Sequence, residues 1–127
     1  MSGLSGHCHC GQCTYSVEHA GTFHFCCLCE GCQRLSAGGR LLGISVPSET
    51  FQATGPLREY TYPGGSGSPI VLSFCEVCST QLFARPTEHA GVVILRASSL
   101  NRELDFKSRK FIFRESAPSW DLQALHE

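Results

Sequence analysis

Short apolar or alternating runs, separated by glycine, proline and serine, follow one another along the whole chain. The first run alternates Cys13, Tyr15 and Val17 with polar residues, which is typical of a strand with one buried face. Further strands are predicted at residues 41–46, 51–54, 58–62, 70–74, 81–85, 92–96 and 110–114. Residues 63–69 are rich in glycine, serine and proline and predict a loop between two of these strands.

Helical patterns are few and short. One short helix is compatible with residues 30–36, and a terminal helix is predicted over 119–125, where Ser119 can act as the N-cap and Asp121 lies in the first turn. Many short strands with little helix predict a mainly β fold, a sandwich or partly open barrel with one or two short helices. At 127 residues, the chain is expected to form a single domain over residues 1–127.

Composition and charge exclude several classes of partner. The formal net charge is −1, and the basic residues between positions 102 and 114 are interleaved with acidic ones, so no nucleic-acid-binding surface is expected. The first residues lack the charged and apolar regions of a signal peptide. The longest apolar run is too short to cross a bilayer. We therefore expect a cytoplasmic protein with reduced thiols and no membrane partner.

Cysteine is the residue type that carries candidate chemistry. The chain has nine cysteines, an odd number that argues against a complete disulfide framework. Several lie too close in sequence to pair with one another without strain. Seven of them form three groups with the spacing of metal ligands: Cys8-x-Cys10, Cys27-x-Cys29-x-x-Cys32 and Cys75-x-x-Cys78.

The first and last groups together offer four thiolates, the number that a closed tetrahedral zinc site requires. Such a site, formed by Cys8, Cys10, Cys75 and Cys78, would link two distant strands and stabilise the fold. The alternative is a pair of buried thiols beside a Cys-x-x-Cys redox motif. That motif normally begins a helix in a βαβ unit, whereas Cys75 follows a predicted strand, so zinc is favoured.

The central group offers three ligands, Cys27, Cys29 and Cys32, and would leave one zinc position open. An open position can bind a thiol or polarise a carbonyl, so the expected cofactors are two Zn²⁺ ions, one structural and one of the catalytic type. In the alternative, another side chain closes this site. The candidates are Cys13, Cys26, His7, His9, His19 and His24, of which His24 has the best spacing.

Arg34 is the nearest fixed cation to the central group, two residues after Cys32. Its guanidinium can bind a substrate carboxylate through a bidentate pair, which makes it the candidate substrate-binding residue. A surface arginine near a helix end explains the same position equally well.

The order of these motifs, continued by Phe74 before Cys75 and by Leu82-Phe83, resembles the glutathione-dependent formaldehyde-activating enzyme family, which includes centromere-protein-V-like proteins. The resemblance implies a β-tent fold with the two zinc sites divided as above. It also implies a carbon–sulfur lyase that makes or breaks the adduct of a thiol, glutathione, with a small aldehyde, formaldehyde. Three positions depart from the family: Ala37 and Ser79 stand where glycine is common, and Phe111 where many members have histidine.

Two other functions compete with the enzyme. A non-catalytic scaffold would hold two fully coordinated zinc ions and bind a protein or peptide. A redox or metal-handling protein would lose zinc reversibly from the central group on mild oxidation.

Overall fold

Two β-sheets and one α-helix make up the part of the chain that the computed structural model describes, residues 3–104 and 109–121. The smaller sheet has the order β1 (Leu4–His7), β2 (Thr14–Val17) and β5 (Gln52–Thr54). The larger sheet has the order β10 (Lys110–Ile112), β3 (Phe23–Cys27), β4 (Leu41–Pro47), β9 (Val92–Arg96), β8 (Gln81–Pro86), β7 (Pro69–Cys75) and β6 (Leu57–Pro63). Helix α1 (Glu30–Ser36) follows β3, and two 3₁₀ turns, η1 (Ala97–Ser99) and η2 (Arg114–Ser116), follow β9 and β10.

The smaller sheet forms because alternate residues of its strands are apolar and buried. Leu4 on β1 and Tyr15 and Val17 on β2 face the core, and their polar neighbours face solvent. The Tyr15 hydroxyl lies 2.6 Å from the Ser99 hydroxyl of η1. Gly6 is required beneath this ring, since a Cβ there would lie 2.3 Å from the Tyr15 ring.

The larger sheet is antiparallel except for its edge, where β10 pairs with β3 in parallel. Its central strands β4 and β9 are largely apolar on both faces, because one face packs on the smaller sheet and the other borders a cavity. Ile44 and Leu95 are partners in this pairing, and both are fully buried. The core between the sheets contains them with Val46, Leu82 and Val93.

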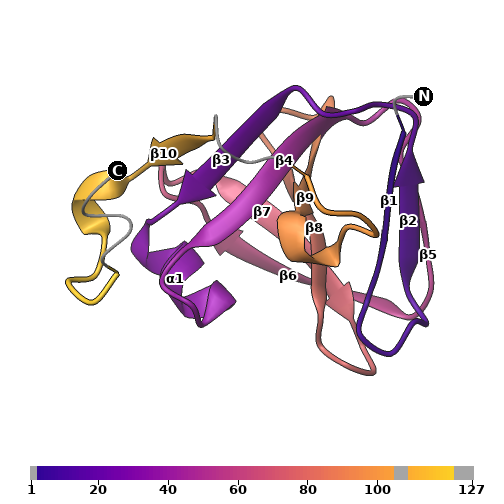
Figure 1. Ribbon diagram of the computed structural model, residues 1–127, viewed down its shortest axis with the longest axis horizontal. Helices are drawn as coiled ribbons and strands as arrows, with labels where there is room; N and C mark the ends of the chain where they lie inside the picture. Colours follow the sequence, from indigo (N-terminus) through magenta and orange to yellow (C-terminus); the bar gives the residue numbers. More distant parts are fainter. Residues whose placement is uncertain (1–2, 105–108, 122–127) are drawn as a thin grey trace.

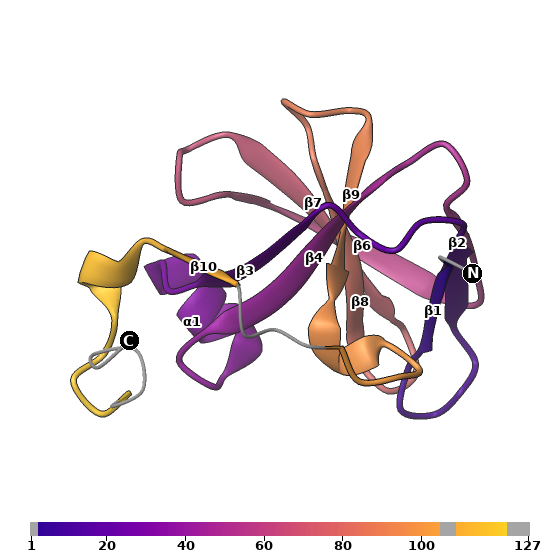
Figure 2. The same cartoon turned by 45° about the horizontal axis from the view of Figure 1, so that its top comes forward.

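The two sheets stay open and do not close into a barrel. In Figure 1 the smaller sheet lies at one end of the molecule, and α1 and β10 lie at the other. Figure 2 shows the strands of the larger sheet spreading apart between these two ends. The architecture therefore separates a cross-linked core near β1 and β2 from a second region around α1, β3 and β10.

These findings confirm the predicted fold class, and α1 spans the predicted residues. Residues 4–7 and 23–27 form β1 and β3, which the sequence pattern did not predict. The last predicted strand is shorter than expected because Phe113 has the left-handed φ of 56°, which ends β10 at Ile112. The predicted terminal helix falls mainly outside the described residues. No helix within residues 3–104 and 109–121 is long and apolar enough to span a membrane.

Candidate metal centre and its cavity

The central cysteines converge where β3 ends and α1 begins. Cys27 is the last residue of β3, Cys29 is the N-cap of α1, and Cys32 lies in the first turn. The Cys29 sulfur caps the helix by accepting a hydrogen bond from the Cys32 backbone N–H at 3.4 Å. This contact holds the Cys29 side chain next to Cys32. All three Sγ atoms lie within 4.8 Å of one another, and all three residues are buried.

Among the residues that the structure describes, no histidine, carboxylate or other cysteine joins this group as a fourth ligand. His24 alternates with Phe25 along β3 and therefore faces the opposite side of the sheet from the cavity. Cys26 takes the same opposite face and lies beside Arg40, whereas Cys13 is buried in the core between the sheets. The three-cysteine group thus has an open side.

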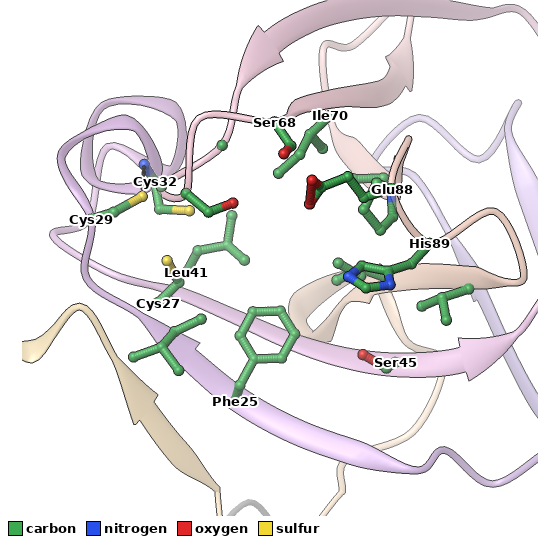
Figure 3. A pocket seen from close by; sticks show the side chains of 18 of the residues that line it. Phe25, Cys27, Cys29, Cys32, Leu41, Ser45, Ser68, Ile70, Glu88 and His89 are labelled. Atoms are coloured by element: carbon green, nitrogen blue, oxygen red, sulfur yellow. Dashed lines mark hydrogen bonds between the residues drawn. The ribbon is translucent and has the colours of Figure 1, made fainter.

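That open side faces a cavity of about 560 Å³. Figure 3 shows Cys27, Cys29 and Cys32 at one end of it and Glu88 and His89 at the other. The walls between them are mainly aliphatic and aromatic and include Phe25, Leu41, Ile70, Val92, Ile94 and Ile112. The cavity is large enough for a small organic ligand.

Arg96, the last residue of β9, is a buried cation in the lining of this cavity. Its Nε donates a hydrogen bond to Gln81 Oε1 at 3.3 Å, and the Gln81 amide donates to the Leu35 carbonyl of α1 at 2.9 Å. Its Nη2 is buried and makes no hydrogen bond of normal geometry among the described residues, although the Tyr62 hydroxyl lies near the guanidinium. A guanidinium with unused hydrogen-bonding capacity beside a cluster of thiols can bind an anion.

The three thiols of the central group differ in pKa. A hydrogen bond from Cys32 lowers the pKa of Cys27 to about 6, burial opposes this shift, and the positive charge of Arg96 contributes to it. The hydrogen bond with Cys27 and burial raise the pKa of Cys32. Cys27 is therefore the thiol of the group that most readily becomes a thiolate.

The four remaining cysteines of the motifs form a second group. Their Sγ atoms lie within 4.8 Å of one another, and Cys10 Sγ is 3.6 Å from Cys8 Sγ and 3.7 Å from Cys75 Sγ. Zinc–sulfur bonds of about 2.3 Å in a tetrahedron place sulfurs about 3.8 Å apart, so this donor set fits zinc. The backbone N–H groups of Val77 and Cys78 point at Cys75 Sγ at 3.3 and 3.4 Å and would stabilise its thiolate.

This four-cysteine group joins the two sheets. Cys8 and Cys10 lie in the turn between β1 and β2. Cys75 is the last residue of β7, and Cys78 lies in the turn between β7 and β8. Cys13 is buried next to the group, and its backbone N–H donates to Cys8 Sγ at 3.3 Å. A metal here would cross-link segments about 65 residues apart, as the sequence analysis expected of a structural site.

Arg34 lies away from the cavity lining. Its side chain is 81% exposed and pairs with Glu30 at 3.7 Å on the outer face of α1. Both residues line a separate, shallower hollow beside Trp120. Arg96 was not predicted as a site residue, although the sequence contains an indication of it. Arg96 lies on the same face of its strand as Val92 and Ile94, and both faces of this strand are apolar. Burying a charged side chain there is costly, which points to a functional role.

Phe111 lies on the other side of this region, among three arginines. The guanidinium carbons of Arg40, Arg109 and Arg114 are 5.5, 5.2 and 4.9 Å from the centre of its ring. Arg40 also pairs with Asp121 through an Nε–Oδ2 bond of 2.9 Å. These contacts attach the C-terminal segment to Arg40, which directly precedes β4.

The comparisons with known proteins agree with this geometry. The model of the family described as glutathione-dependent formaldehyde-activating enzyme matches residues 3–116, which include both cysteine groups. The chain belongs to this family. A crystal structure of a Rhodobacter sphaeroides protein, a structural-genomics target, has a similar fold, with a TM-score of 0.66 and 17% identity over 84% of this chain and 98% of that chain. No protein with a curated description matches the chain.

Membership in the formaldehyde-activating family confirms the resemblance, and the structure explains two departures from it. Ala37, the C-cap of α1, and Ser79, just after Cys78, have φ values of 58° and 67°. Glycine adopts this left-handed conformation without strain, whereas other residues pay about 1 kcal/mol or more. The positions where the family commonly has glycine are therefore left-handed turns.

Proposed function

We propose that the protein catalyses the reversible addition of a thiol to an aldehyde, as a zinc-dependent carbon–sulfur lyase. The observation that carries the proposal is the group of three buried cysteines, open on one side to a cavity and without a fourth ligand among the described residues. The family description supports glutathione as the thiol and formaldehyde as an aldehyde of this chemistry.

The reaction needs no oxidant or reductant. The thiol sulfur forms a bond to the carbonyl carbon, the π electron pair moves to the oxygen, and the proton of the thiol ends on that oxygen. Zinc held by Cys27, Cys29 and Cys32 would supply a Lewis acid that favours the thiolate form of the substrate. Cys8, Cys10, Cys75 and Cys78 would hold the structural ion.

The remaining steps fall to the protein's own residues. The apolar walls around Phe25 and Leu41 exclude water and thereby strengthen electrostatic interactions at the thiols. The guanidinium of Arg96 would offset the negative charge of the cysteine thiolates and of the oxygen that becomes an alkoxide. Arg34, the arginine proposed from the sequence, would serve only a substrate that extends beyond the cavity over α1.

The test begins with zinc content, measured on freshly purified, reduced protein before and after addition of excess glutathione. Two zinc ions per chain, one of them perturbed by the thiol, would support the proposal. The formation of a thiol–aldehyde adduct is then followed by proton NMR, with Cys29→Ser as the inactive control. Two zinc ions that no thiol perturbs, and no rate above that of the control, would favour the scaffold instead.

A further inference from the structure

We propose that the aldehyde handled at this centre carries an apolar substituent, which lies in the cavity beside the three cysteines. The inference rests on the proposed function, because it concerns the second substrate of the same site. It departs from the family description in one respect: formaldehyde, which has a single carbon atom, would not be the preferred aldehyde.

The cavity is much larger than formaldehyde. The cavity measures about 560 Å³, within the range of about 300–1,000 Å³ that is typical of sites for drug-sized ligands. Formaldehyde has only two heavy atoms, so the part of this volume that the thiol leaves free would be filled with water. Water in an apolar enclosure lacks hydrogen-bond partners, so an apolar group that displaces it binds favourably.

The walls of the cavity nearest the cysteines are apolar. The surfaces nearest the thiols come from Phe25 and Leu41, which pack with Cys27, Cys29 and Cys32 in one buried cluster. Ile94 and Ile112 pack against the same cluster from β9 and β10. Four strands thus contribute apolar side chains that converge on the reactive end of the cavity.

Among the described residues, few charged side chains line the cavity. The lining of the cavity, as far as the structure describes it, contains the charged or titratable side chains of Arg96, Glu88 and His89, besides the cysteines and Tyr62. Glu88 and His89 lie at the far end from the cysteines, with Phe25, Leu41 and Ile70 in between (Figure 3). The charge nearest the cysteines is that of Arg96, which the thiolates and the developing alkoxide offset. A further charged group on the aldehyde would meet the apolar walls, and burying it there is costly.

The experiment measures kcat/KM for formaldehyde, butanal, hexanal and phenylacetaldehyde with glutathione held constant. Each methylene that the cavity buries should raise kcat/KM by about fourfold. Binding of the unreactive alcohols butanol, hexanol and 2-phenylethanol, measured by calorimetry, should follow the same order and does not depend on turnover.

Two matched variants locate the effect. Ile94→Thr places a hydroxyl in the cavity wall and should weaken hexanol binding by about fourfold or more. Val71→Thr makes a similar change on β7, outside the cavity lining, and should leave hexanol binding unchanged.

The outcomes separate the inference from the proposed function. Equal or faster reaction of formaldehyde, together with no binding of the alcohols, would overturn the inference and leave the proposed function standing. Graded binding of the alcohols with no adduct from any aldehyde would overturn the proposed function, while supporting an apolar ligand for the cavity. Equal losses in Ile94→Thr and Val71→Thr would also contradict the inference, since the effect would not come from the cavity.

Discussion

The four-cysteine group should contribute most of the stability of the fold, which a pair of matched variants can measure. Cys75→Ala removes one of the four sulfurs that join the two sheets. Cys13→Ala removes the same atom from a residue that is also fully buried, in the same core and next to the same group, but is not one of the four. The difference between the variants therefore isolates ligation from packing.

The magnitudes differ enough to decide the question. Zinc bound by four such ligands contributes about 10–16 kcal/mol in small zinc domains, and a domain of this kind has a net stability of only about 5–15 kcal/mol. Loss of one ligand should therefore leave Cys75→Ala largely unfolded. Cys13→Ala loses only packing around one sulfur atom, and we expect about 1–2 kcal/mol.

The assay is urea unfolding followed by circular dichroism, at a fixed low concentration of free zinc. Cys29→Ser serves as the third variant, because serine is a preferred N-cap and keeps the hydrogen bond at the start of α1 while changing a ligand of the central group. It should stay folded and lose activity, with a smaller loss of stability than Cys75→Ala, because cysteines this close in sequence can also bind zinc in the unfolded chain. Equal destabilisation by Cys75→Ala and Cys13→Ala, or by Cys75→Ala and Cys29→Ser, would refute the division into structural and catalytic sites.

Three further predictions follow from individual contacts. Arg96→Gln should lower kcat/KM by about 10- to 100-fold, because it removes a charge-assisted interaction, and Arg96→Lys should recover part of the loss. Arg34→Gln should have little effect on kcat/KM. A larger loss in Arg34→Gln than in Arg96→Gln would favour Arg34, the arginine predicted from the sequence, as the substrate-binding residue. Ala37→Gly and Ser79→Gly should each raise the free energy of unfolding by about 0.5–1 kcal/mol, because glycine adopts a positive φ without strain. A lower free energy of unfolding, measured in urea, would show that the contacts of the Ala37 or Ser79 side chain outweigh this strain. Burial raises the pKa of Tyr15 to about 12 from 10 in the unfolded chain, so this neutral phenol contributes stability below pH 10 that is lost as pH rises to 12. The loss should be about 2–3 kcal/mol and should be absent in Tyr15→Phe; an identical alkaline decline in both proteins would contradict this assignment.

Local sequence determined much of this protein. Cys27, Cys29 and Cys32 lie within six residues, so a strand end and one helical turn suffice to bring them together. Strands such as Val92–Arg96 were predicted because their boundaries are marked by residues that turn the chain. β3 was missed because Phe25 and Cys27 face the cavity while Cys26 is buried on the opposite face, so apolar and polar residues do not alternate along the strand.

Only the tertiary structure decided which arginine lies at the cysteines. Arg34 follows Cys32 by two positions, which on an α-helix is a rotation of about 200°, so α1 carries it to the outer face. Arg96 is 64 positions away from Cys32, but the pairing of β9 with β4, opposite Gly43, places it in the cavity lining. The cavity itself is made by residues of several strands, and no local pattern specifies how distant strands come together.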